Sequence, residues 1–373
     1  MIYFDNAATG GFKPYLATQA TEYSIKYLLA NPGRSGHKLS KLGEDFVYKC
    51  RKQLCSFFNN DTLSNIAITK NCSEALNIAI FGTVKKGGHI IFSCYEHNSV
   101  IRPIKMLASL NYISYSVISP KTTTITAEDI KPLIQENTYM VIINGASNVT
   151  GEIADIYNIG ALLKPLDIIF MVDGAQLAGH YKIDMQKQNI DILAVAGHKG
   201  LHSIMGVGAL LFNKKTVINP IFCGGTGTET FEDLASSYPE LLEYGTHNLP
   251  AICSLYEGLI YTNDNLEFFA KNLFDKTRFC IELLKSLKLK IYSKPNPCGI
   301  VSFACDKIDS ITLCDILSEK YDIATRGGFH CAPLTHNFLN TQNNGLLRVS
   351  FSPQNTHYEI KKLYYALKEI IAF

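Results

Sequence analysis

The sequence predicts an α/β protein built on a mostly parallel sheet with helices on both faces. Short apolar runs rich in Ile and Val alternate with helical patterns through the first two-thirds of the chain. These runs are apolar on both faces and are bounded by Gly, Asn or Asp, as strands of a sheet covered by helices on both sides are. A chain of 373 residues also exceeds what one hydrophobic core usually organises, which predicts a second domain.

Six apolar runs predict the strands of the main sheet. They are residues 65–69, 89–94, 139–145, 167–173, 191–197 and 208–212. The segment 126–135 predicts a connecting helix, since Thr126 can cap it and acidic residues occupy its first turn. In such folds ligands bind beyond the carboxyl ends of the strands, so the residues that follow each strand are the candidates for function.

A smaller α+β domain is expected at residues 256–373, after a large domain at 16–255, with residues 1–15 packing against the small domain. Its elements are helices at 273–287, 310–321 and from 357 onward, and strands at 299–305 and 346–352. The last helix starts with a capping box formed by Thr356 and Glu359.

Composition excludes several classes of protein. The net charge of +2 is spread along the chain without a basic stripe, so neither nucleic acid nor a membrane surface is an expected partner. No apolar run approaches the roughly 20 residues of a membrane span. The N-terminus is too short and too acidic for a signal peptide. The 11 cysteines form no CxxC pair or His/Cys cluster, which predicts reduced thiols in a cytoplasmic protein without structural zinc.

Lys199 directly follows the predicted strand at 191–197. A lysine desolvated at that position would have a lowered pKa and a nucleophilic amine, which suits Schiff-base chemistry. Alternatively, its side chain could extend past the loop to water. What the neighbouring strands carry decides between these interpretations.

Three further strand ends carry groups that suit pyridoxal phosphate. Asp173 could cap a helix or hold a proton on a pyridine nitrogen, and Gln176 lies one helical turn later, where it could donate to a phenolic oxygen. His97 could lie flat on the ring or serve as a structural histidine. Cys72 and Ser73 begin a predicted helix, whose free N–H groups can bind phosphate, although such residues also cap helices without a ligand. Their joint occurrence favours the cofactor.

Ten ordered motifs extend this pattern over nearly the whole chain. They are YFDNAATG at the start, NPGRSGH (31–37), EHNS (96–99), SNVTG (147–151), VDGAQ (172–176), GHKG (197–200), GGTGTE (224–229), YGTHNLP (244–250), RGGFHCAP (326–333) and RVSFSPQNT (348–356). With these motifs the chain resembles the class V aminotransferases of fold type I, and among them the group II (SufS-like) cysteine desulfurases. The resemblance implies a seven-stranded, mostly parallel sheet in the large domain.

The resemblance implies a role for each candidate residue. Lys199 would bind the cofactor covalently, Asp173 would pair with the pyridine nitrogen, Gln176 would contact the phenolic oxygen and His97 would stack on the ring. The phosphate-binding matches are Cys72, Ser73, His198 and, from the other subunit of a homodimer, Thr246. The substrate-binding matches are Asn148 and Arg348, which hold the α-carboxylate, together with Arg326 and His37.

Cys331 distinguishes a desulfurase from other members of the family. It lies in a glycine-bearing polar stretch without helix or strand period, which predicts an exposed loop. Arg326 and His330 are expected to favour its thiolate, the nucleophile that would take sulfur from a substrate thiol. The implied reaction converts L-cysteine to alanine, leaves a persulfide on Cys331 and passes that sulfur to an acceptor protein or a small thiol, as in iron–sulfur cluster assembly.

The chain departs from the family pattern in three places. It begins almost at YFDNAATG, without the N-terminal helix of many relatives. The phosphate turn reads NCSEA where Gly-Thr-Thr-Glu-Gly is common, so side-chain contacts to phosphate are expected mainly from Ser73. GLHSIMG follows Lys199 where Tyr-Gly-Pro is commoner. These departures suggest a divergent branch whose sulfur acceptor could differ.

Three alternatives remain open from the sequence. A selenocysteine lyase would use the same residues on the selenium analogue. A class V aminotransferase or epimerase would leave Cys331 without a catalytic role. A non-catalytic scaffold would keep the fold and lack the cofactor's visible absorbance.

Overall fold

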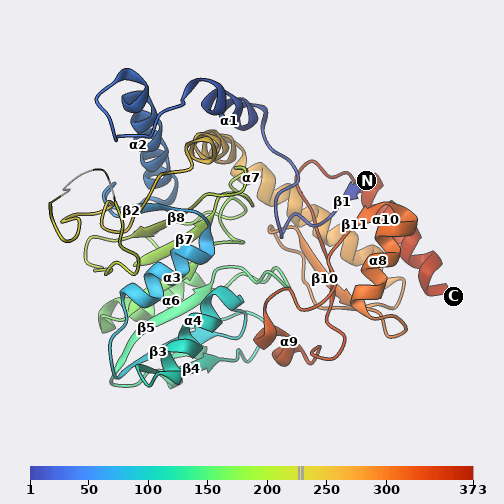
Figure 1. The fold of residues 1–373 in the computed structure, drawn as a ribbon. Helices are drawn as coiled ribbons and strands as arrows, with labels where there is room; N and C mark the ends of the chain where they lie inside the picture. Colours follow the sequence, from blue (N-terminus) through green and yellow to red (C-terminus); the bar gives the residue numbers. More distant parts are fainter. Residues whose placement is uncertain (226, 228–230, 373) are drawn as a thin grey trace.

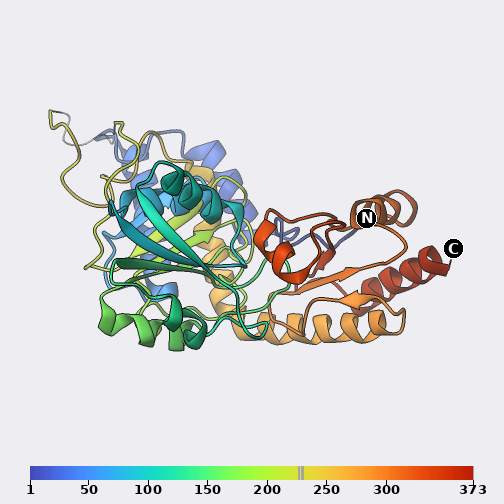
Figure 2. The same cartoon turned by 90° about the horizontal axis from the view of Figure 1, so that it is seen from below.

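The computed structural model describes residues 1–225, 227 and 231–372. It contains a large region built on one sheet and a smaller C-terminal region, joined by the long helix α7 (Leu249–Lys285). Figure 1 shows both regions, and Figure 2 shows α7 running from one into the other. The expected domain boundary at residue 255 falls inside this helix, and the division at that residue stays a prediction.

The main sheet has seven strands in the order β2-β8-β7-β6-β5-β3-β4. Their bounds are β2 Ile66–Thr69, β3 Gly88–Ser93, β4 Ile113–Ile118, β5 Thr138–Asn144, β6 Ile169–Asp173, β7 Ile192–Ala196 and β8 Gly208–Phe212. Among these strands β8 alone runs against the direction that the other six share, so the mostly parallel α/β sheet is confirmed. The strand β4 was missed because it lies at the sheet edge and is buried only at its two ends, so it lacks a continuous apolar run.

Helices cover both faces of this sheet. They are α1 Tyr15–Tyr27, α2 Lys38–Phe58, α3 Cys72–Gly82, α4 Asn98–Ser109, α5 Ala127–Ile130, α6 Ile156–Leu163 and the 3-10 turns Lys131–Leu133 and Lys164–Leu166. Successive residues of β6 point to opposite faces: Met171 packs with the side chains of α3 and α4, and Val172 packs with those of α2, α6 and α7. Each face therefore has its own core.

The connecting helix expected at 126–135 is shorter than predicted. The α-helical part ends at Ile130, and a 3-10 turn follows that contains Pro132. Proline has no N–H to donate, which prevents the α-helical hydrogen bond at that position. The prediction of Thr126 as the cap is confirmed, because Asp129 completes a capping box with it.

The C-terminal region has a separate core. Its elements are β9 Lys290–Ile291, β10 Ile300–Ala304, α8 Ser310–Tyr321, β11 Ile323–Ala324, α9 Pro333–Leu339, β12 Leu347–Ser350 and α10 His357–Ala372. The N-terminal strand β1 (Ile2–Tyr3) pairs in parallel with β11. The N-terminal segment therefore reaches from the C-terminal region back to the end of β7, as Figure 1 shows. No described helix is long and apolar enough to cross a membrane.

Candidate active site

Lys199 lies in the turn that follows β7, at the carboxyl edge of the main sheet. The N-terminal segment holds this turn: His198 O accepts hydrogen bonds from Gly10 N and from Lys13 Nζ, each 3.0 Å long. Residues far apart in sequence thus fix the backbone that carries the lysine.

The Lys199 side chain is half-buried, and its amine makes no hydrogen bond or ion pair within the described part of the chain. Burial lowers its pKa, and the nearby Asp173 carboxylate and Cys72 thiol offset part of that effect. A larger fraction of the amine is therefore neutral than for a lysine in water, as the sequence predicted.

Asp173 ends β6 and is 2% exposed. Its Oδ1 accepts hydrogen bonds from Ala175 N at 2.9 Å and from Cys72 Sγ at 3.7 Å. The Cys72 thiol is therefore directed at the carboxylate. The thiol is therefore not directed at a phosphate, and the only contact that Cys72 can offer a phosphate is its backbone N–H.

The first turn of α3 leaves N–H groups without partners inside the helix, as every α-helix does. Asn71 caps it, with Oδ1 accepting from Glu74 N at 2.9 Å. Ser73 Oγ lies 2.7 Å from Ser99 Oγ, which is 2.9 Å from His97 Nδ1. This hydrogen-bonded chain brings the starts of α3 and α4 together. The arrangement suits an anion that carries a ring toward His97.

Two histidines of the site are held uncharged. Burial lowers the pKa of His198 to about 4, with Lys199 and Lys13 adding to the effect, and its Nδ1 lies 3.0 Å from Thr9 Oγ1. Burial also lowers the pKa of His97, whose Nδ1 accepts from Ser99 N. His198 can therefore offer phosphate a hydrogen bond but not a positive charge.

Arg348 on β12 is 1% exposed and points into the site region. Its Nη2 pairs with Asp5 Oδ1 at 2.8 Å, and its Nη1 donates to Asn148 O at 2.9 Å. Its Nε has no partner in the described part of the chain. A buried guanidinium held on one side by protein keeps its remaining donor for an incoming carboxylate.

The Cys331 loop lies between the two regions of the molecule, just before α9, and Figure 1 shows α9 near α4. Asn98 N donates to Cys331 O at 2.8 Å, and Asn148 Nδ2 donates to His330 O at 2.7 Å. Cys331 is exposed, and Arg326 Nη2 lies 3.9 Å from its Sγ. The exposed loop and the Arg326 contact agree with the sequence analysis.

The expected contribution of His330 to the Cys331 thiolate is wrong. His330 is 3% exposed, and its Nε2 donates to Leu346 O at 3.1 Å. Burial, followed by Arg348 and Arg326, lowers its pKa well below the usual value, so it carries no charge. Arg326 is the cation that contacts the thiol. Exposure alone does not single out Cys331, because Cys223 is exposed as well.

Five buried polar atoms of the site have no hydrogen-bond partner in the described part of the chain. They are Asn148 Oδ1, Gln176 Oε1, His330 Nδ1, Arg348 Nε and Glu96 Oε2. Such atoms are costly unless a ligand engages them. With the free lysine amine and the Asp173 carboxylate, they fit pyridoxal phosphate and an amino acid. Gln176 Nε2 donates to Ala7 O at 2.7 Å, so its unpaired atom is an acceptor.

The residues expected to serve a neighbouring subunit lie away from this group. Thr246 Oγ1 accepts from Asn31 Nδ2 at 3.3 Å, and His37 caps α2 through Ser40 N at 3.3 Å. Neither is bonded to the Lys199 region among the described residues. In the expected segment 224–229, residues 226, 228 and 229 lie outside the described residues.

Sequence reasoning missed two acidic residues of the site. Asp5 fixes Arg348, and Glu96 Oε1 accepts from Ser93 Oγ and Asn144 N, both at 2.6 Å. Burial raises the pKa of Glu96 to about 8, so it carries a proton at neutral pH. Both lie inside motifs that the sequence analysis singled out, and their acidic side chains in apolar surroundings could have drawn attention. No described cluster of His, Cys, Asp and Glu could hold a metal ion.

The family model that matches is "Aminotransferase class-V", over residues 2–363. Two curated relatives, from Pyrococcus abyssi and Borreliella burgdorferi, are each described as "Probable cysteine desulfurase" and are 31% identical over 100% of this chain and 94% and 92% of their own length. A solved apo cysteine desulfurase from Thermococcus onnurineus matches with a TM-score of 0.91 and 28% identity, over 100% of this chain and 94% of that one. An Escherichia coli cysteine desulfurase structure matches with a TM-score of 0.89 at 23% identity, over 99% of this chain and 94% of that one, which supports the fold alone.

Proposed function

The chain belongs to the class-V aminotransferase family, and from this premise we propose that it is a pyridoxal phosphate-dependent cysteine desulfurase. One observation carries the proposal beyond the family. Cys331 is an exposed thiol with a guanidinium 3.9 Å away, on a loop tied by hydrogen bonds to the residues around the cofactor site. An aminotransferase would have no use for a nucleophile in that position.

Each residue of the candidate site has a proposed role in binding the cofactor or the substrate. Lys199 would hold pyridoxal phosphate, Asp173 would keep a proton at its ring nitrogen, and the first turn of α3 would take the phosphate. When bound, the cofactor supplies an electron sink for the substrate's α-carbon. Arg348 and the Asn148 amide would fix the substrate's carboxylate, which orients its thiol toward Cys331.

The chain's own groups would then act on the substrate. In its neutral form, which the lowered pKa favours, the Lys199 amine can accept the α-proton and later return a proton to the product. The Cys331 thiolate can attack the substrate sulfur, so that a bond forms between the two sulfurs and the bond from Cβ to sulfur breaks. L-Alanine leaves, and the sulfur remains on Cys331 as a persulfide. An acceptor must then remove it.

Mass spectrometry of the enzyme after reaction with L-cysteine tests the proposal. The wild type should form alanine and carry a persulfide on Cys331. Cys331→Ala should lose alanine formation and the persulfide but keep the bound cofactor's visible absorbance. Cys223→Ala is the matched control, because it removes the other exposed thiol, and it should behave as the wild type.

Other outcomes would identify a different enzyme. Retained transamination in Cys331→Ala, with no persulfide in the wild type, would assign an aminotransferase. Faster turnover of selenocysteine than of cysteine would assign a selenocysteine lyase. A protein that binds no cofactor would be a scaffold, and the desulfurase proposal would be wrong.

We propose in addition that the active enzyme is a homodimer, in which Thr246 and His37 of one subunit face the cofactor of the other. Large apolar side chains exposed on α1 and α2 support a partner on this side of the molecule, among them Tyr15, Tyr27 and Leu42. Light scattering should give twice the monomer mass.

A further inference from the structure

A cavity of about 380 Å³ lies beside Cys331 on the outer side of the site. Its walls come from α3 and α4, and neither Lys199, Asp173 nor Arg348 lines it. It is therefore distinct from the place where the amino acid substrate binds. His97 and the Cys331 side chain form the part of its lining that is shared with the active site.

The cavity carries positive charge that the protein does not neutralise. Arg102 lines it, and its guanidinium forms no hydrogen bond or ion pair within the described part of the chain. None of the described residues that line the cavity is an aspartate or glutamate. Arg102 and Arg326 both act on His97 to lower its pKa, which places both cations near the same point. An anion is the ligand that such surroundings favour.

The remaining walls are apolar or neutral. Phe81, Pro103 and Met106 supply apolar surface, and Asn77 supplies an amide. A volume of this size is at the lower end of the range found for small-molecule sites, roughly 300–1,000 Å³. The cavity is thus suited to a small molecule with an apolar body and one anionic end.

We propose that this cavity binds the sulfur acceptor and that the acceptor is a small anionic thiol, with a carboxylate or a similar group that pairs with Arg102. This inference rests on the proposed desulfurase function. The acceptor's thiolate would attack the outer sulfur of the Cys331 persulfide. A bond forms between the acceptor sulfur and that outer sulfur, the bond to Cys331 Sγ breaks, and Sγ leaves as a thiolate. The outer sulfur keeps its proton, so the step needs no oxidant or reductant.

A series of small thiols tests the inference. Enzyme that has been loaded with sulfur from L-cysteine is treated with 3-mercaptopropionate, 2-mercaptoethanol or cysteamine, and the loss of the Cys331 persulfide is followed by mass spectrometry. Arg102→Met should slow the reaction with 3-mercaptopropionate by roughly tenfold, the effect of losing one charge-assisted hydrogen bond. The reaction with neutral 2-mercaptoethanol should be unchanged, and cysteamine should react equally fast or faster.

Lys105→Met is the matched control. Lys105 is an exposed cation on the same helix but does not line the cavity, so its loss should leave all three rates unchanged. Because each rate is compared between variant and wild type for one thiol, differences in intrinsic thiol reactivity cancel.

The outcomes separate the two proposals. If the persulfide does not form before thiol is added, the desulfurase function is wrong. If it forms, but Arg102→Met changes all three rates by the same factor or not at all, the anionic-thiol inference is overturned. In that case the acceptor is a protein or another molecule that does not use Arg102.

Discussion

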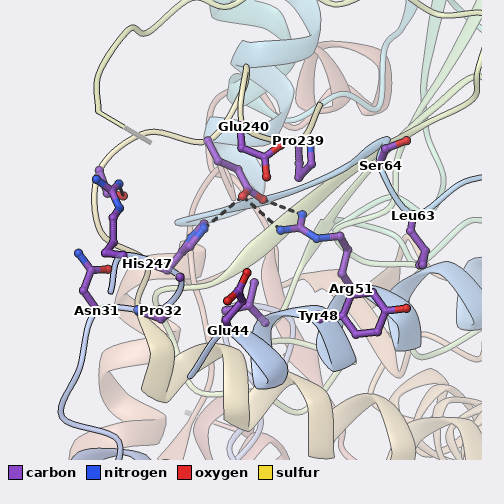
Figure 3. A pocket seen from close by; sticks show the side chains of 15 residues that line it. Asn31, Pro32, Glu44, Tyr48, Arg51, Leu63, Ser64, Pro239, Glu240 and His247 are labelled. Atoms are coloured by element: carbon purple, nitrogen blue, oxygen red, sulfur yellow. Dashed lines mark hydrogen bonds and ion pairs between the residues drawn. The ribbon is translucent and has the colours of Figure 1, made fainter. Parts of the chain in front are cut away.

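Two buried groups of charged residues in this chain differ in how completely their polar atoms are paired. In the first, called here the Glu243 cluster, Glu243 binds Arg51 and His247. Figure 3 labels Arg51 and His247 and draws their interactions as dashed lines, beside a cavity of about 330 Å³ that Glu243 also lines. Oε1 accepts from Arg51 Nη1 at 2.8 Å and from Ile68 N at 2.7 Å, and Oε2 accepts from Arg51 Nη2 at 3.2 Å and from His247 Nε2 at 3.1 Å.

The second group surrounds Lys199 and is left incomplete. Gln176 Oε1, Asn148 Oδ1 and Arg348 Nε are buried without a partner in the described part of the chain, and the half-buried lysine amine has no partner there either. Each unpaired buried group costs about 1–3 kcal/mol. The Glu243 cluster therefore stabilises the folded protein. The Lys199 group lowers the stability of the cofactor-free protein, and a bound cofactor and substrate can restore it.

The largest expected effect comes from comparing two lysines whose pKa is lowered by burial, Lys199 in the candidate active site and Lys276 of α7 outside it. Lys199→Ala should lower turnover of L-cysteine by at least roughly 10²–10⁴-fold, since loss of a proton-transfer group alone costs that much. The stability of the cofactor-free protein should not fall, because the change removes a half-buried amine without partners. Turnover assays and thermal unfolding of the apoprotein measure the two effects.

Lys276→Ala is the matched control. Lys276 is 3% exposed, and burial lowers its pKa to about 8, but its Nζ donates to Asn272 Oδ1 at 2.5 Å and to Pro353 O at 2.6 Å. This variant should lose about 1.5–3 kcal/mol of stability, the value of a hydrogen bond to a charged group, and keep its activity. A destabilised Lys199→Ala apoprotein would contradict the assignment of Lys199 to function.

Much of this site could be predicted from the sequence because strands buried on both faces are recognisable as apolar runs. The candidate functional residues lie at the ends of these strands. Asp173 ends such a strand, Lys199 and Ser73 follow others within a few residues, and the structure places all three at the carboxyl edge of the sheet. What the sequence could not provide were contacts between residues distant in the chain. The pairing of Asp5 with Arg348 spans the two ends of the protein.

The incorrect prediction for His330 has the same origin. A histidine next to Cys331 in sequence was expected to act on it as a cation. Whether a histidine is charged depends on burial, and burial is set by packing against β12 and its neighbours. Sequence proximity therefore identified the loop but not which side chain supplies the positive charge.

The second prediction concerns the Glu243 cluster and is of intermediate size. Arg51→Met should destabilise the protein by about 3–5 kcal/mol, because it leaves the Glu243 carboxylate buried without its main cation. The double variant Arg51→Met/Glu243→Leu should recover part of this loss. Chemical denaturation of the three apoproteins measures it. An unchanged free energy of unfolding in Arg51→Met would show that the pair does not stabilise the fold.

The pH dependence of the same cluster has a defined sign. Burial alone would raise the pKa of Glu243, but Arg51 and the hydrogen bonds from His247 and Arg51 outweigh it and lower the pKa to about 2. A carboxylate with a lowered folded-state pKa stabilises above its unfolded value of roughly 4.3. The stability advantage of the wild type over Glu243→Gln should therefore shrink as the pH falls from about 4 toward 2.

The smallest effect on stability is expected at Gln176. This residue tests most directly whether unpaired buried atoms distinguish the Lys199 group from the rest of the core. Gln176→Met removes one hydrogen bond, to Ala7 O, but also removes a buried oxygen that has no partner. The two changes oppose each other, so the free energy of unfolding of the apoprotein should change by no more than about 1 kcal/mol. The affinity for pyridoxal phosphate should fall by roughly tenfold, as expected from the loss of one hydrogen bond of about 1.4 kcal/mol.

Asn296, a buried amide outside the candidate site, is the control for Gln176. Asn296 Nδ2 donates to Lys294 O at 2.8 Å and to Ile300 O at 2.7 Å, and its Oδ1 accepts from Ile300 N at 3.2 Å. Asn296→Leu leaves these backbone groups unpaired and should cost several times more stability than Gln176→Met while leaving cofactor affinity unchanged. Cofactor titration and denaturation of both apoproteins test this. Equal losses of stability would mean that unpaired atoms do not distinguish the site from the rest of the core.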